Sequence, residues 1–244
     1  MNKMGGYIDI HTHLLPGVDD GSTSMDMTKR MLGLALEQQI ETILVTPHYE
    51  VGVSNPSAND LLRLKDQVQE EALKLSPKLR ILLGNEIFYS ESIVEDLKEK
   101  KALTLADSRY VLVEFSTRES YATIFRGFTG LIRAGYLPIL AHVERYNCLY
   151  KQEDLIRELV DSGCYIQMNS NSLIGGLFDT EVTRCRKLLT HGLVHLIGSD
   201  CHDDRVRTPS MAKAVKALRK KCDMELIHKI FYENPIKVIE NTYI

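Results

Sequence analysis

The sequence predicts an α/β protein whose parallel strands close into a single barrel. Short β-branched or aliphatic runs alternate with longer segments of helical periodicity, which is typical of βα units. Seven such units follow one another without a Pro/Gly/Ser-rich linker or a change of composition, so we expect one domain over residues 1–244. Histidines or acidic residues follow all but one of the predicted strands.

Composition sets outer limits on the class of protein. Of 244 residues, 44% are hydrophobic and 26% charged, which disfavours disorder, collagen-like repeats and coiled coils. No apolar run approaches the roughly 20 residues of a membrane span, and the first residues lack the apolar core of a signal peptide. We therefore expect a cytoplasmic protein without membrane insertion. A net charge of -3 gives no basic field for nucleic acid.

The strands are predicted from the apolar runs, in chain order. We expect them at residues 7–10, 42–46, 80–83, 110–113, 137–141, 165–168 and 195–198. Helices are predicted between them where apolar residues recur at spacings of three and four. These stripes are Met27, Met31, Leu34 and Ala35, then Leu61, Leu64, Val68, Ala72 and Leu75, and finally Met211, Ala214, Val215 and Leu218.

The polar residues at the strand ends distinguish a barrel from an open sheet. In a barrel of parallel strands all carboxyl ends open on one face, so residues far apart in sequence converge there. In an open sheet several of them would be stranded along an edge. The residues concerned are His11, His13, Asp20, His48, Glu86, Glu114, His142, Asp200 and His202.

Two of these motifs have the spacing of paired ligands. His11 and His13, like Asp200 and His202, are two residues apart, so both side chains of a pair point to the same side of an extended strand. The nine side chains are too many for one ion, and so many carboxylates would repel one another without cations. We expect two or three divalent ions. Nitrogen and oxygen ligands without thiolate suit Mn first, with Fe, Zn or Co as alternatives.

The same residues lie in motifs that resemble those of the polymerase and histidinol phosphatase (PHP) family. The similarity covers the chain from the first strand to the last. Its motifs are residues 8–21, Thr46-Pro47-His48, Gly84-Asn85-Glu86, Val113-Glu114, Ala141-His142-Val143-Glu144-Arg145-Tyr146 and Gly198-Ser199-Asp200-Cys201-His202. Within the family, the chain is most similar to the bacterial protein-tyrosine phosphatases encoded with capsule and exopolysaccharide genes.

This resemblance implies a distorted seven-stranded (β/α) barrel that holds three metal ions. It implies three ligand sets: His11, His13 and Asp200; Asp20, His48 and His202; and Glu114 with His142, Glu86 bridging two ions. Asp19 is left out, and we expect it to form an Asx-type turn. The implied activity is hydrolysis of phosphotyrosine by a metal-bound hydroxide. The implied partner is the tyrosine-phosphorylated tail of a kinase of the polysaccharide-export system.

Two arginines are candidates for binding the phosphate, because a planar guanidinium matches phosphoryl oxygens. Arg145 follows His142 by three residues and Arg207 follows His202 by five, and the resemblance points to both. Arg205 competes with Arg207, but a surface pair with Asp203 or Asp204 explains it equally simply. No general acid for the leaving group is identifiable.

Several other functions fit parts of the sequence. Residues 201–208 satisfy the C-x5-R-T signature of cysteine-dependent phosphatases, but its two aspartates would repel phosphate and keep the Cys201 pKa high. The five cysteines otherwise predict reduced thiols, because no C-x-x-C is present. A phosphoesterase of the histidinol-phosphatase type keeps the metals and changes the substrate. An amidohydrolase would leave His202 and both glutamates unexplained, and a degenerate binding module should lack ligands.

Overall fold

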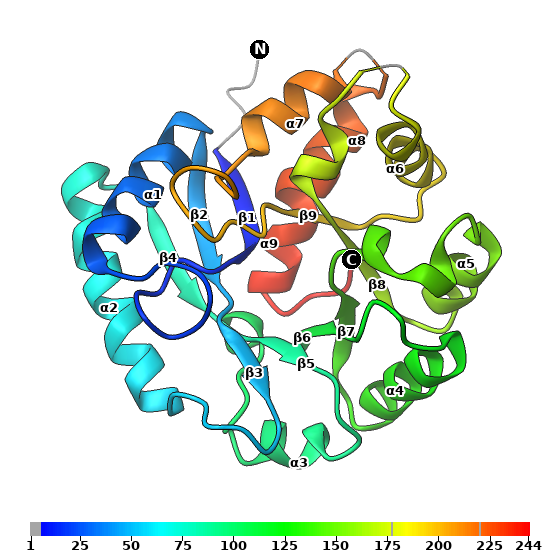
Figure 1. The fold of residues 1–244 in the computed structure, drawn as a ribbon, viewed down its shortest axis with the longest axis horizontal. Helices are drawn as coiled ribbons and strands as arrows, with labels where there is room; N and C mark the ends of the chain where they lie inside the picture. Colours follow the sequence, from blue (N-terminus) through cyan, green and yellow to red (C-terminus); the bar gives the residue numbers. More distant parts are fainter. Residues whose placement is uncertain (1–5, 177, 220) are drawn as a thin grey trace.

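Parallel strands lie at the centre of the structure and helices surround them (Figure 1). The computed structural model describes residues 6–176, 178–219 and 221–244. In this part of the chain the strands are β1 (Tyr7–Thr12), β2 (Ile40–Val45), β3 (His48–Glu50), β4 (Arg80–Leu83), β5 (Glu86–Phe88), β6 (Tyr110–Glu114), β7 (Leu137–Leu140), β8 (Tyr165–Asn169) and β9 (Leu196–Gly198). All described strand pairs are parallel.

The strands form two sheets, and not the single closed ring of seven that the sequence predicts. One sheet has the order β1-β2-β4 and the other the order β3-β5-β6-β7-β8-β9. A bridge between Thr12 and Cys201 links the end of β1 to the residues after β9. Among the described residues β4 pairs with β2 alone, and the short helix η1 (Leu105–Asp107) lies against β4 and β6.

Each predicted strand overlaps an observed one, and the two additional strands continue β2 and β4 after a break. Pro47 separates β2 from β3, and a proline cannot donate the hydrogen bond that a continuous strand needs. Gly84 and Asn85 separate β4 from β5. The Asn85 side chain fixes both breaks, because it donates to the Pro47 carbonyl (2.8 Å) and accepts from the Leu103 amide (2.8 Å).

The helices surround the strands and complete the βα units, except for α9, which lies among the strands near the middle of the view (Figure 1). They are α1 (Met25–Glu37), α2 (Ala58–Leu75), α3 (Ile93–Lys98), α4 (Tyr121–Arg133), α5 (Glu153–Asp161), α6 (Thr180–Thr190), α7 (Met211–Leu218), α8 (Met224–His228) and α9 (Asn234–Ile239), with the short turns η2 (Val143–Arg145), η3 (Asn147–Leu149), η4 (Ser170–Leu173) and the π-helix η5 (Lys229–Glu233). No helix in the described ranges is both long enough and apolar enough to cross a bilayer.

Side-chain caps define where several helices begin. The hydroxyls of Ser24, Ser57 and Ser120 accept from backbone amides of the first turns of α1, α2 and α4. The predicted apolar stripes lie in α1, α2 and α7, where most of their residues are buried or partly buried. Leu75 is the exception, because it lies in the last turn of α2 and is half exposed.

Two apolar clusters stabilise the fold, one on each side of the strands. The larger cluster joins the helices to the outer strand faces. The smaller one lies between the strands and includes Ile8, Ile10, Leu44, Leu105, Tyr110, Leu112, Ile139, Ala141, Leu196 and Val238. It fills the space beneath the carboxyl ends of the strands, where the polar residues gather.

A change of register in β1 places His11 above this inner cluster. Between Asp9 and Thr12 three residue steps on β1 oppose two steps on β2, from Ile43 to Val45. Such a bulge reverses the side-chain alternation. Ile8 and Ile10 face the inner cluster. Because of the bulge, the next residue, His11, points to the same side of the sheet as Ile10, toward the polar centre.

Candidate metal centre

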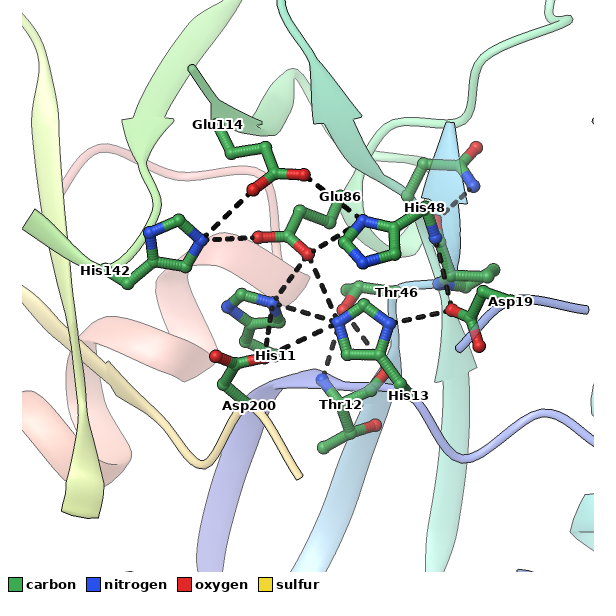
Figure 2. Close-up of polar contacts among 12 residues, drawn as sticks. His11, Thr12, His13, Asp19, Thr46, His48, Glu86, Glu114, His142 and Asp200 are labelled. Carbon is green, nitrogen blue, oxygen red and sulfur yellow. Dashed lines mark hydrogen bonds and ion pairs between the residues drawn. The ribbon is translucent and has the colours of Figure 1, made fainter. Parts of the chain in front are cut away.

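The carboxyl ends of the strands bring all nine predicted ligand residues into one cluster. Figure 2 shows those other than Asp20 and His202. His11 lies on β1, His48 on β3, Glu86 on β5 and Glu114 on β6. His13, Asp20, His142, Asp200 and His202 lie in the loops that follow β1, β7 and β9. Residues up to 191 positions apart in sequence, such as His11 and His202, thus share one site.

Glu86 occupies the middle of the cluster. Its Oε2 atom lies 3.1 Å from Nε2 of His11, 3.1 Å from Nε2 of His13 and 3.2 Å from Nδ1 of His48. Its Oε1 atom lies 2.9 Å from Nε2 of His142. One buried carboxylate therefore faces four imidazoles, as Figure 2 shows.

The other carboxylates lie around Glu86. Glu114 contacts Nδ1 of His48 (3.2 Å) and Nε2 of His142 (3.4 Å). Asp200 lies 3.6 Å from the Nε2 atoms of both His11 and His13. On the open side of the cluster, Asp20 lies 3.3 Å from Nε2 of His48 and 3.3 Å from Nε2 of His202.

These contacts form three groups whose ligand atoms lie within 4.8 Å of one another. The groups are His13, Asp20, His48 and His202; His11, His13, Glu86 and Asp200; and His48, Glu86 and Glu114. The Nε2 atoms of His11 and His13 lie only 3.3 Å apart and face the same carboxylates. Two imidazole nitrogens in this arrangement need a cation or a shared proton between them. Nitrogen and oxygen donors without thiolate fit divalent metals such as Mn, Fe or Zn.

The cluster strongly perturbs its own titration. Burial acts to lower the pKa of His13, but the Asp19 and Glu86 carboxylates outweigh it and raise that pKa to about 10. For His142, Glu114 and Glu86 likewise outweigh burial and raise the pKa to about 9. Burial acts to raise the pKa of Asp200, yet the charge of His11 and its other neighbours hold it at about 2. Protons on His13 and His142 thus balance the carboxylates beside them, and divalent cations would replace those protons.

Two residues of the cluster have an uncommon backbone conformation. His142 has φ 33° and Asp200 has φ 53°, both in the left-handed region. Only a few per cent of non-glycine residues adopt it, although Asp and His are enriched among them. His142 lies two residues after the end of β7, and Asp200 lies two residues after the end of β9. In this conformation their side chains reach residues of other strands, Glu86 for His142 and His11 for Asp200.

Comparison with known proteins agrees with this geometry. The family described as "Capsular polysaccharide synthesis, CpsB/CapC" matches residues 7–240. The chain belongs to the CpsB/CapC family. It is 36% identical to tyrosine-protein phosphatase CpsB of Streptococcus pneumoniae, over 95% of this chain and 98% of that protein. It is 31% identical to tyrosine-protein phosphatase YwqE of Bacillus subtilis, over 90% of this chain and 86% of that protein.

Solved structures show the same relationship. A chain from crystal structures of YwqE and CpsB, described as unique metal-dependent tyrosine phosphatases, superposes with a TM-score of 0.89 at 30% identity. The superposition covers 97% of this chain and 96% of that chain. The phosphotriesterase homology protein of Escherichia coli has a TM-score of 0.59 at 13% identity, over 96% and 98% of the two chains, which shows a shared fold alone.

In this member of the CpsB/CapC family, three supporting residues complete the cluster without belonging to the predicted ligands. Asp19 Oδ2 lies 2.7 Å from Nδ1 of His13. Gln167 Oε1 accepts from the His142 amide (2.7 Å) and lies 3.4 Å from Nδ1 of His11. The Asn169 side chain accepts from Gln167 (3.0 Å) and donates to Asp200 (2.8 Å). Such contacts orient metal-binding side chains.

Both arginines that the sequence singles out contact the centre. Arg145 Nη2 lies 2.5 Å from Oδ2 of Asp200, and Arg207 Nη2 lies 2.9 Å from Oδ1 of the same carboxylate. Both guanidinium groups are partly exposed, so they face the centre from its open side. Arg205 points elsewhere: its side chain is 87% exposed, and its closest described acid is Asp204 at 3.9 Å.

Cys201, two tyrosines close to the proposed ligands and the other histidines lie outside the centre or are buried beneath it. Cys201 is fully buried, and burial raises the pKa of its thiol, as do nearby carboxylates. Tyr49 and Tyr146 are also buried, so neither presents a free ring to the mouth of the site. The other histidines of the chain bond elsewhere: His191 to Glu153, His228 to Glu233, and His195 to the Ile166 amide.

Proposed function

We propose that this chain is a metal-dependent protein-tyrosine phosphatase. The observation that carries the proposal is the buried Glu86 carboxylate shared by four imidazoles, in a chain that is similar to tyrosine phosphatases over nearly its whole length. We assign His11, His13 and Asp200 to one ion, Asp20, His48 and His202 to a second, and Glu114 and His142 to a third, with Glu86 bridging two of them. Manganese is the metal we place there first.

Bound divalent ions supply Lewis acidity and lower the pKa of coordinated water. The protein supplies the rest of the chemistry. Arg145 and Arg207 bind phosphoryl oxygens and balance the charge that grows in the transition state. To do so, each guanidinium would exchange its contact with Asp200 for the substrate, and Asp200 would then be free to hold a metal ion. Asp19 and Gln167 hold the tautomers of His13 and His11 in which Nε2 is the ligand atom.

We further infer that the two sheets are one seven-stranded barrel in which two strands are interrupted, within a single domain. The natural substrate in this proposal is a phosphotyrosine-bearing tail of a kinase that controls capsule or exopolysaccharide synthesis. Dephosphorylation would then take place in the cytoplasm. The similarity to CpsB and YwqE, both called tyrosine-protein phosphatases, supports this substrate over histidinol phosphate.

The test compares a phosphotyrosine peptide with histidinol phosphate as substrates. Each is assayed with the purified protein, after a chelator, and after Mn²⁺ is added back, alongside elemental analysis. We expect preferential cleavage of the peptide, loss of activity with the chelator and recovery with Mn²⁺. Cleavage of histidinol phosphate alone would retain the metal chemistry and refute the protein substrate. Activity that survives complete metal removal would refute the mechanism.

A further inference from the structure

We propose that Phe88 binds the aromatic ring of the substrate and selects aryl over alkyl phosphates. This inference rests on the proposed phosphatase function and concerns the same site. It starts from the short strand β5, which also carries Glu86. Ile87 is fully buried in the outer apolar cluster, so Glu86 and Phe88 both point to the opposite side of the strand. Phe88 is nevertheless 36% exposed.

The strand register places Phe88 directly beside the proposed ligands. Phe88 pairs with Glu114 of β6 on one side and with Glu50 of β3 on the other. Two residues earlier on β5, Glu86 pairs with His48. Phe88 therefore stands in the same row as Glu114, two residues above the row of His48 and Glu86. Two residues of a strand span about 6.6 Å, so the Phe88 side chain begins roughly that far above Glu86.

This height corresponds to the ring of an aryl phosphate. With its phosphoryl group at the level of Glu86, a phosphotyrosine extends its ring outward by a length comparable to this step. The ring then lies beside Phe88, where offset or edge-to-face contact between rings is favourable. The phosphate of an alkyl ester, such as phosphoserine, brings no ring to this level. Phe88 is thus placed to distinguish aryl from alkyl phosphates, both by contact with a ring and by its height above Glu86.

The other aromatic residues near the site are already engaged. Tyr89 stacks on Phe115 at a ring distance of 4.7 Å, and Phe115 also contacts Phe128. Tyr146 is buried beside His142, and its hydroxyl accepts from the Phe115 amide (3.1 Å). Within the described residues, none of these ring contacts involves Phe88. Its face remains available to a ligand.

The experiment measures binding without turnover. Phenylphosphonate and methylphosphonate share a phosphonate group, contain no scissile ester and differ in the ring. Both are titrated by calorimetry into the Mn²⁺-loaded protein and into Phe88→Ala, Phe88→Leu and Phe88→Trp, each checked for equal metal content. Phe178→Ala is the matched control, because Phe178 is 99% exposed and lies outside the metal centre.

We expect Phe88→Ala to weaken phenylphosphonate binding by roughly threefold to tenfold. Methylphosphonate binding should stay within about twofold, since contacts to the phosphonate oxygens are unchanged. Phe88→Trp should retain the preference for the phenyl group, Phe88→Leu should lose most of it, and Phe178→Ala should change neither affinity.

Equal changes for both phosphonates in Phe88→Ala, or a full preference retained in that variant, would overturn the assignment. So would failure of the wild-type protein to prefer phenylphosphonate. A protein that cleaves no phosphomonoester but shows ring-selective binding that depends on Phe88 would refute the phosphatase function and leave the ring site standing. Hydrolysis of phosphotyrosine with no effect of Phe88→Ala on either ligand would refute the ring site and leave the phosphatase function standing.

Discussion

Asp19 Oδ2 lies 2.7 Å from Nδ1 of His13, on the side of the imidazole away from the nitrogen that faces Glu86. The other carboxylate oxygen of Asp19 accepts from the Gly21 amide (2.9 Å), as an Asx-type turn requires. The expected turn is therefore present, and the same side chain also orients a proposed ligand. Adjacent aspartates thus have different functions: Asp20 faces the open side of the centre and Asp19 supports it from behind.

Replacing Asp19 by Asn separates its two functions. An amide oxygen can still accept from Gly21, but an Asn amide that faces His13 cannot match the carboxylate as an acceptor. We expect metal affinity to fall by about 10- to 100-fold, with the fold intact. Metal titration of the apoprotein, with Asp26→Asn on the exposed start of α1 as the control, checks this. Wild-type affinity in Asp19→Asn would show that the contact has no orienting function.

Replacing Glu86 by Gln removes the charge that four imidazoles share. We expect metal content to fall sharply and phosphatase activity to fall by at least about 100-fold, because the proposed centre would lose the carboxylate that contacts four imidazoles. Elemental analysis and phosphotyrosine hydrolysis measure the two effects on one sample. Glu70→Gln, at an exposed position of α2, is the control. A fully active Glu86→Gln protein would contradict the proposed ligand set.

The three arginines near the mouth are expected to respond differently to alanine. Arg145→Ala and Arg207→Ala should each raise KM for a phosphotyrosine peptide by roughly 10- to 100-fold, since each loses a charge-assisted hydrogen bond. Metal content should stay unchanged. Arg205→Ala should behave like wild type, because that side chain is 87% exposed and does not reach Asp200. An effect of Arg205→Ala larger than that of Arg207→Ala would reverse the assignment.

Cys201 is expected to be dispensable for the reaction. Its thiol is fully buried and its pKa is raised by burial, so it provides no thiolate at neutral pH. Cys201→Ser should retain activity within about threefold, and iodoacetamide should not inactivate the native enzyme. Complete inactivation of Cys201→Ser with its metals still bound would instead support a cysteine nucleophile.

His195 lies away from the metal centre and is expected to make the free energy of unfolding depend on pH. Burial, and to a smaller extent the charge of Lys229, lower its pKa from 6.5 to about 4. The unfolded chain therefore binds a proton near pH 6.5 that the folded chain does not bind until about pH 4. The free energy of unfolding should decrease as pH falls across this interval, by up to about 3 kcal/mol from this group, and this term vanishes above the interval.

The measurement for His195 is urea unfolding at several pH values. His195→Asn keeps an acceptor for the Ile166 amide but cannot bind the proton. Its unfolding free energy should fall less steeply between pH 6.5 and 4 than that of wild type, by about one proton in the slope. Parallel slopes for the two proteins would show that His195 titrates normally in the fold.

Aliphatic runs and strand-end ligands are the features that the sequence reveals best. Residues 80–83 form β4 as predicted. An aliphatic run between two helical segments indicates a strand from the local sequence alone, whichever strands it pairs with. The three-residue strands β3 and β5 escape detection, because His48–Glu50 and Glu86–Phe88 are too short to show periodicity. The breaks that separate them from β2 and β4 are bound by the Asn85 side chain, through tertiary contacts that no local pattern reveals.

The supporting residues of the site are harder to predict than the ligands. Parallel topology alone brings the strand ends together, so the ligand positions follow from strand order. Asp19 and Gln167 act through the path of a loop and the orientation of a ring, which no spacing encodes. A signal was present in β8, where Gln167 and Asn169 are polar residues two apart near the end of an otherwise apolar strand. The same spacing is the basis of the proposed ligand pairs at the ends of β1 and β9.

The division of the strands into two sheets gives the metal centre a second consequence. His11 comes from the three-stranded sheet, whereas His48, Glu86 and Glu114 come from the six-stranded one. An ion held jointly by His11, His13 and Glu86, as we propose, would therefore be a further link between the two sheets, beside the bridge from Thr12 to Cys201. Folding and metal uptake would then be linked equilibria, since ligands from the two sheets meet only when both sheets are docked, and an ion held by both sheets would oppose their separation.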